Sequence, residues 1–245
     1  MKCNLWFFLI VILTTACSKQ IYLTEVRPGA IRIDKTSQSV DPTISALIVP
    51  YKMQLDSTMN KVVVYFDDEL VKNKPNSSLG NWFADAMFEK AYSIDKKVDF
   101  AIQNYGGLRI PSVAAGPVTV GKLYELMPFD NTLFIVEIPG IVLQQLLDRI
   151  ADYGGWPVSR NISFIAEYGK AKSIIIRDSE FSQDSIYTVA LPDYVAQGGD
   201  NCDFLTELKA LDTGILIRDV IIENLEMLNS KGLRLKADHS IRIKD

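Results

Sequence analysis

Apolar residues recur at helical spacing along four segments of the chain, and this pattern predicts four helices. The segments are residues 41–58, residues 78–93, the stretch that follows Pro139 and ends at Gly154-Gly155, and residues 213–229. Residues of the types that cap helices flank three of them: Asp41 before a proline, Ser77 or Ser78, and Asp212. The Gly-Gly pair favours the left-handed turn that commonly ends a helix.

Shorter runs rich in β-branched and alternating residues predict strands between these helices. They are residues 61–66, 98–103, 132–138, 162–168, 172–178 and 186–192, followed by an extended pair within 233–245. Helices and strands alternate irregularly, and the later strands are separated by short polar turns. This order favours an α/β (α+β) fold with a mixed sheet and packed helices over a doubly wound parallel sheet. No repeat or low-complexity linker divides residues 41–245, so we expect a single domain there.

The composition sets broad limits on function. The chain has 245 residues, 48% of them hydrophobic, with a formal net charge of −4. This length and apolar content suit one large domain or two small ones. The mild acidity, with no long run of Lys or Arg, gives no electrostatic footprint for a nucleic-acid partner.

The N-terminus resembles the signal of an exported lipoprotein. Lys2 precedes an apolar run from Leu5 to Leu13, which is too short to cross a bilayer core of about 30 Å. Small residues then lead to Cys17, which cleavage would leave as a lipidated N-terminus. We therefore expect a signal with lipobox at 1–17, a tether at 18–40, and membrane anchoring at the outer membrane, facing the periplasm. The alternative is an ordinary signal peptide with an incidental cysteine.

Candidate catalytic residues are scarce. His239 is the single histidine, without an H-x-x-H or D-x-H neighbour, and no G-x-S-x-G elbow, P-loop or GxGxxG motif follows a strand. A Ser–His–Asp triad built on His239 stays open, but no motif supports it. Cys202, the thiol left after lipidation of Cys17, is expected to be a packing residue without a disulfide. We expect no catalytic residue, metal ligand or cofactor on this chain alone.

Four short stretches, far apart in the sequence, together resemble one family. They are NSSLGNWFADAM (76–87), QNYGGLR (103–109), LMPFDNTL (126–133) and LPDYVAQGGDNCDF (191–204). In order and spacing they are similar to the C-terminal, substrate-binding domain of the 5′-nucleotidase/UDP-sugar hydrolase family, over roughly residues 42–243. The resemblance implies a domain that binds the nucleoside, while a separate N-terminal metallophosphatase domain hydrolyses the phosphate ester with divalent metals.

The resemblance also implies roles for three residues of the last two stretches. Phe129 and Tyr194, the latter where the family often has phenylalanine, would sandwich the base. Asp200, after a Gly-Gly turn, would accept hydrogen bonds from the ribose hydroxyls. Without the resemblance, both rings could be core aromatics and Asp200 a turn residue.

The QNYGGLR stretch supplies the remaining expected contacts. Asn104 would meet the base edge, Gly107 would permit close approach, and Arg109 would contact the ribose or phosphate side. Their plain alternatives are a helix or turn cap for Asn104 and a surface ion pair for Arg109. The arginine that the family often places before SLGN is replaced here by Pro75, with Lys74 beside it, so base stacking is implied more strongly than phosphate binding.

Three functions are compatible with these features. The first is the binding half of a split nucleotide hydrolase in nucleotide catabolism, joined to a separately encoded metallophosphatase chain through an apolar patch that includes Trp82, Trp156 and the 41–58 helix. The second is a non-catalytic envelope lipoprotein that binds nucleosides or nucleotides. The third is a degenerate structural domain.

Overall fold

The computed structural model describes residues 29–30 and 41–245. The expected signal, Cys17 and nearly all of the 18–40 tether lie outside these residues. The chain divides into two units between Ile48 and Val49, within helix α2 (Pro42–Met59). The helix begins as the sequence predicts, because the Asp41 carboxylate accepts hydrogen bonds from the amides of Thr43 (2.8 Å) and Ile44 (3.3 Å). No side chain of α2 is buried.

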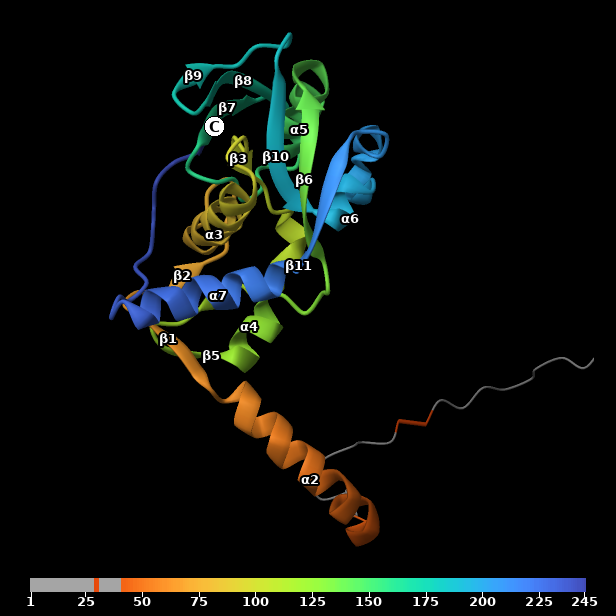
Figure 1. Cartoon of the computed structure of the whole chain (residues 1–245), viewed down its shortest axis with the longest axis vertical. Helices are drawn as coiled ribbons and strands as arrows, with labels where there is room; N and C mark the ends of the chain where they lie inside the picture. The colour runs from red at the N-terminus through yellow and green to blue at the C-terminus, as the bar shows by residue number, and fades with distance from the viewer. Residues whose placement is uncertain (1–28, 31–40) are drawn as a thin grey trace, which may run out of the picture. The chain divides into compact units, whose positions relative to one another are not determined.

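A mixed four-stranded sheet forms the centre of the larger unit, in the order β11-β6-β10-β3 (Figure 1). Its strands are β3 (Phe100–Ala101), β6 (Thr132–Pro139), β10 (Ile186–Pro192) and β11 (Ala210–Leu216). Strand β10 is antiparallel to β6 and parallel to β3, and β11 is antiparallel to β6. The mixed α/β fold expected from the sequence is therefore confirmed.

The other strands form three smaller sheets. The second four-stranded sheet has the order β12-β7-β8-β9, and the two-stranded sheets pair β1 with β5 and β2 with β4. Their bounds are β1 (Val62–Phe66), β2 (Leu70–Val71), β4 (Ser112–Val113), β5 (Gly116–Thr119), β7 (Ile162–Glu167), β8 (Lys170–Ile176), β9 (Ser179–Glu180) and β12 (Ile243–Lys244). The remaining helices are α3 (Ser78–Ile94), α4 (Val120–Leu126), α5 (Gly140–Asp152), α6 (Asp193–Ala196) and α7 (Ile217–Ser230), with short 3₁₀ turns η1 (Tyr105–Gly107), η2 (Gly199–Asn201) and η3 (Asp203–Leu205).

Two apolar clusters pack against opposite faces of the central sheet, because successive strand residues point to alternate faces. Ile135 of β6 and Ala190 of β10 join the cluster formed with α3, α4 and α7. Their neighbours Val136 and Val189 join the cluster formed with α5, β7 and β8. Both faces of the sheet are thus covered. The ends of its strands are where loops can carry polar chemistry.

The last predicted helix starts later than expected. Residues 213–216 belong to the bulged end of β11, whose pairing with β6 shifts between Asp212 and Leu216. The Asp212 carboxylate accepts from the Gly214 amide at 2.8 Å, inside this bulge, and does not cap α7. Pairing with β6 thus outweighed local helical spacing, and α7 begins at Ile217.

The predicted extended pair at the C-terminus is wrong. Leu235 bridges to Phe66 of β1, whereas Ile243 pairs in parallel with Phe164 of β7, so the segment passes from one sheet to another. Arg242 fastens this segment to α3: its guanidinium is nearly buried and donates to both carboxylate oxygens of Asp85, at 2.8 and 2.9 Å.

The two tryptophans expected in a docking patch are core residues. Trp82 is 6% exposed and Trp156 is 1% exposed, so neither offers an apolar surface to a partner. Trp82 packs edge-on against Phe66 inside the first cluster, and Trp156 belongs to the second.

None of the helices in the part of the chain that the structure describes is long and apolar enough to cross a membrane.

Candidate functional site

Three loops meet at one end of the central sheet, where its strands begin or end. Strands β3 and β10 are parallel, so the segments after their carboxyl ends, at Asn104 and Tyr194, emerge together. Strand β6 is antiparallel to β10, with Leu133 opposite Pro192, so the loop that precedes β6 reaches the same edge. A cavity of about 340 Å³ lies between these loops, lined by Asn104, Gly106, Gly107, Arg109, Met127, Phe129, Asn131, Tyr194 and Asp200. All six binding residues expected from the sequence are in this list.

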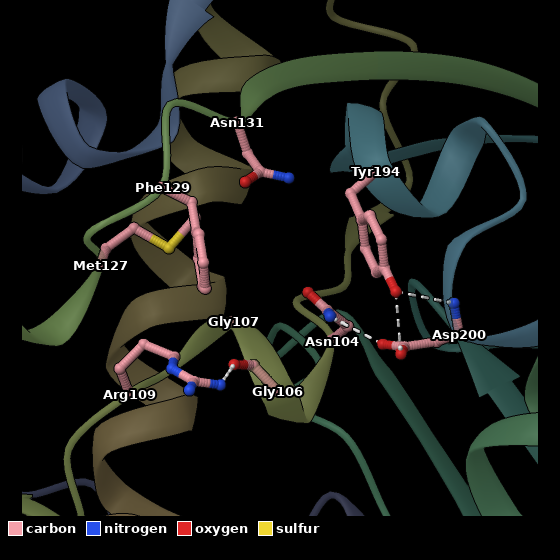
Figure 2. Close-up of a pocket in the computed structure, with 9 residues that line it drawn as sticks. All are labelled: Asn104, Gly106, Gly107, Arg109, Met127, Phe129, Asn131, Tyr194 and Asp200. Atoms are coloured by element: carbon pink, nitrogen blue, oxygen red, sulfur yellow. Dashed lines mark hydrogen bonds between the residues drawn. The ribbon is translucent and has the colours of Figure 1, made fainter. Parts of the chain in front are cut away.

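Two aromatic rings form opposite walls of the cavity. Figure 2 shows Phe129 and Tyr194 facing each other across the open space. Phe129 is 41% exposed and Tyr194 is 47% exposed, which rules out the alternative that they are core aromatics. Apolar surface left open on facing rings is suited to a flat ligand that stacks between them.

The Gly-Gly pair before Asp200 is required by the shape of the turn. Gly198 has φ 95°, a left-handed conformation that glycine adopts without strain, and Asp200 follows with φ 54° and ψ 34°. A Cβ on Gly199 would lie 2.5 Å from ring atoms Cε1 and Cζ of Tyr194. The missing side chain therefore lets the Tyr194 ring lie against the turn that presents Asp200.

A directed chain of hydrogen bonds joins the floor of the cavity to one wall. The Asp200 carboxylate can only accept, so the Asn104 amide presents its nitrogen to Oδ2, at 2.7 Å. The oxygen of that amide then accepts from Gln103 Nε2 at 2.9 Å. Tyr194 OH lies 3.4 Å from Asp200 Oδ1 and from the Asp200 amide. Asn104 is thus held in one orientation, and its second N–H has no acceptor among the residues that the structure describes.

Gly107 was expected to permit close approach of a ligand. It also makes room for the Gln103 side chain that orients Asn104. A Cβ on Gly107 would lie 2.0 Å from Gln103 Nε2, so any side chain there would displace the amide that orients Asn104. Gln103 itself is fully buried.

Cations gather on the Arg109 side of the cavity. Arg109 donates to the Gly106 carbonyl at 3.3 Å, and its guanidinium carbon lies 5.5 Å from the centre of the Phe129 ring. Lys72 Nζ and Lys74 Nζ lie 3.9 and 4.7 Å from the centre of the Tyr105 ring. Burial, followed by the charges of Arg109 and Lys74, lowers the pKa of Lys72, and burial lowers the pKa of Lys74.

These three cations have no carboxylate within 4.0 Å among residues 29–30 and 41–245. The surface ion pair considered for Arg109 is therefore not formed with any residue that the structure describes. Lys72 and Lys74 donate to the carbonyls of Leu108 (2.7 Å) and Tyr153 (2.6 Å) and do not line the cavity, so Arg109 is the cation best placed to meet an anionic group there.

The family model for the 5′-nucleotidase C-terminal domain matches residues 59–207, more than half of the chain. The chain belongs to this family. The resemblance inferred from four short stretches is thereby confirmed.

Relatives of this 5′-nucleotidase C-terminal domain are larger proteins. The trifunctional nucleotide phosphoesterase protein YfkN of Bacillus subtilis is 26% identical over 234 residues, which cover 83% of this chain and 16% of the relative. The 5′-nucleotidase of Vibrio vulnificus is 27% identical over 214 residues, 80% of this chain and 38% of the enzyme. The chain therefore spans less than half the length of these relatives.

Solved structures agree on the fold. The 5′-nucleotidase precursor of Thermus thermophilus superposes with a TM-score of 0.70 at 24% identity, covering 82% of this chain and 43% of that one. At this identity the likeness establishes the architecture of the 5′-nucleotidase C-terminal domain and not its ligand.

Sequence reasoning missed several residues that shape the pocket of this domain. Asn131 lines the cavity and points into it in Figure 2, and Met127 lines the wall beside Phe129. Both lie inside the LMPFDNTL stretch, and a polar residue just before a buried strand is a usable signal for Asn131. Gln103 precedes Asn104 and Gly106 lies two residues after it, and neither gave a signal of its own.

Two titratable residues considered from the sequence, His239 and Cys202, do not line the cavity. His239 is exposed, and the buried Cys202 thiol lies beneath Asp200, with Sγ 3.9 Å from the Asp200 carbonyl oxygen. Within the described residues, no group of three or more His, Cys, Asp or Glu side chains is arranged to hold a metal ion.

Proposed function

We propose that this domain binds the nucleoside part of a nucleotide, which a metallophosphatase domain then hydrolyses. The observation that carries the proposal is the convergence of Phe129, Tyr194, Asn104 and Asp200 on one cavity, with the two rings facing each other. The family supports a substrate-binding role, and each residue has a chemistry that suits one part of a nucleoside.

The base is placed between the two rings. Stacking on an aromatic side chain contributes about 1–3 kcal/mol per base and tolerates any base, because every base has a π-face. The free N–H of Asn104 would donate to an acceptor atom on the base edge, since the amide oxygen is already engaged by Gln103. This orientation favours bases that present an acceptor at that edge.

The ribose is placed against Asp200. A carboxylate has about four lone-pair positions, and the contacts from Asn104 and Tyr194 leave room for two sugar hydroxyl donors. Because the Tyr194 contact is long, at 3.4 Å, a ribose hydroxyl can replace it at little cost.

The phosphate end is assigned to Arg109, with Lys72 and Lys74 contributing positive charge. The family often has an arginine at the position of Pro75. Here Arg109 lines the cavity, and Lys72 and Lys74 lie over the ring of Tyr105, the residue before Gly106.

Hydrolysis is assigned to a metallophosphatase domain that carries the divalent metals, on a partner chain. The larger relatives include a nucleotide phosphoesterase and a 5′-nucleotidase, which supports a nucleotide ligand and a phosphatase partner. Affinity capture of this chain, followed by a phosphatase assay with AMP, tests the assignment. Recovery of AMP hydrolysis in the captured material supports it, whereas binding of nucleosides with no hydrolytic partner favours a binding lipoprotein.

Calorimetry with adenosine, AMP and UDP-glucose tests the binding site itself. Tyr194→Ala should weaken binding of each ligand by about tenfold or more, because one stacking wall is lost. Tyr65→Ala is the matched control, since Tyr65 is also 47% exposed but lies on β1, outside the cavity. Equal effects of the two substitutions, or no binding by the wild type, would contradict the proposed function.

We also propose that the chain is exported and anchored through lipid on Cys17, at the outer membrane facing the periplasm. The support is the residue pattern of positions 1–17. Two acylation signals or more are needed for stable anchoring, and a lipidated N-terminal cysteine meets that need. Cys17→Ala should abolish fatty-acid labelling and release the protein from the membrane fraction; retained labelling would refute the proposal.

A further inference from the structure

The loop that carries Phe129 contains neither helix nor strand. Helix α4 ends at Leu126 and β6 begins at Thr132, so residues 127–131 are irregular. Three residues of this loop, Met127, Phe129 and Asn131, line the cavity (Figure 2). The position of one stacking wall therefore depends on contacts from outside the loop.

The hydrogen bonds that hold the loop backbone at the carbonyls of residues 127, 129 and 131 come from the first two residues of α7. The Ile217 amide donates to the Asn131 carbonyl at 2.9 Å. Arg218 Nη1 donates to the carbonyls of Met127 (3.2 Å) and Phe129 (3.1 Å). Arg218 Nη2 donates to Asp130 Oδ1 at 2.7 Å. One guanidinium thus binds the loop on both sides of the Phe129 side chain.

Arg218 is buried and packed against an aromatic ring while it makes these contacts. Its side chain is 7% exposed, and its guanidinium carbon lies 4.1 Å from the centre of the Tyr124 ring on α4. A planar guanidinium fixes several acceptors in one geometry, whereas an ammonium on a flexible stem presents a single point of charge. Arg218 is not among the residues that line the cavity.

We propose that Arg218 is a positioning residue that sets the distance and angle of the Phe129 wall and thereby controls the stacking of the base. This inference rests on the proposed function for its effect on affinity. Its structural part, that Arg218 orders Phe129, holds for the ligand-free protein and can be tested alone.

The test uses Arg218→Lys, which keeps the charge but lacks the fork. The matched control is Leu225→Ala on the same helix, because Leu225 is fully buried in the α3–α7 core about two turns away. Asp130→Ala is a milder second variant that removes one acceptor from a side chain that is 80% exposed. The phenylalanines are replaced by 4-fluorophenylalanine, and the Phe129 fluorine signal is assigned by its loss in Phe129→Leu.

We expect the Phe129 fluorine signal to shift or broaden in Arg218→Lys and, to a smaller extent, in Asp130→Ala. It should keep its position in Leu225→Ala, although that variant is less stable. Adenosine affinity measured by calorimetry should fall about tenfold in Arg218→Lys and change less than about twofold in Leu225→Ala.

An unchanged Phe129 signal in both Arg218→Lys and Asp130→Ala would overturn the inference. An equal shift of the signal in Leu225→Ala would also overturn it. If wild-type protein binds no nucleoside, the proposed function fails, and the fluorine comparison still decides whether Arg218 orders the loop.

Discussion

Replacing Asp200 by asparagine would remove one negative charge from the cavity and little else. Asparagine has the same shape, and it is one of the few residues besides glycine that tolerates the left-handed backbone found here, at φ 54° and ψ 34°. The new amide oxygen could still accept from Asn104, which now lies 2.7 Å from Oδ2. Asp200→Asn is therefore a cleaner test than Asp200→Ala, which would add backbone strain.

The expected size of the effect follows from the number of hydrogen bonds to the charge. A hydrogen bond to a charged group contributes about 1.5–3 kcal/mol, against about 0.5–1.5 kcal/mol for a neutral one. Each bond thus loses about 1 kcal/mol. Two ribose hydroxyls would lose about 2 kcal/mol, which makes adenosine binding about 30-fold weaker. Within the protein only the Asn104 contact is short, so the free energy of unfolding should fall by about 1 kcal/mol.

Calorimetry with adenosine and with 2′,3′-dideoxyadenosine separates this effect from a general distortion. The dideoxy compound lacks both hydroxyls, so its affinity should be the same for wild type and Asp200→Asn. Urea unfolding of both proteins supplies the stability difference. Unchanged adenosine affinity, or an equal loss with the dideoxy compound, would refute the placement of the ribose on Asp200.

Three further changes test the architecture around the site. Gly199→Ala should cost about 1–3 kcal/mol in urea unfolding and weaken adenosine binding, because the added Cβ would lie 2.5 Å from Tyr194 ring atoms; wild-type values for both would contradict that packing. Burial raises the pKa of the Cys202 thiol from 9.0 to about 11. Iodoacetamide at pH 8 should therefore label native protein far more slowly than unfolded protein, and equal labelling rates would contradict this. The free energy of unfolding should also fall as the pH rises from about 9 toward 11, because the thiol ionises more readily in the unfolded chain. Arg242→Met should lower the free energy of unfolding by about 3 kcal/mol, since it leaves the partly buried Asp85 without its bidentate partner, and a loss below about 1 kcal/mol would show that the contact is dispensable.

The convergence of the candidate site could be anticipated because its residues lie in short motifs at strand ends. A Gly-Gly-Asp turn after a buried strand, and an aromatic just before another, place Asp200 and Phe129 at a sheet edge once the strands pair. The caps of two helices were also readable: Asp41 accepts from the Thr43 amide at the start of α2, and Ser77 accepts from the Gly80 amide at the start of α3, both at 2.8 Å.

Contacts between segments distant in the sequence could not be read in the same way. Arg218 looks like a helix-surface residue from its spacing, and only the tertiary structure brings its guanidinium to the loop at 127–131. The start of α7 was misplaced for a related reason, because pairing of β11 with β6 is a long-range effect. Trp82 was misread as a surface residue because a broad apolar helix face does not reveal which of its members the neighbouring helix covers.

A crystal structure of the protein with adenosine would test the central claim most directly. We expect the adenine ring between Phe129 and Tyr194, with the ribose hydroxyl oxygens about 2.5–3.0 Å from the carboxylate of Asp200. Adenosine bound away from these rings, or a base between them with the ribose turned away from Asp200, would contradict it.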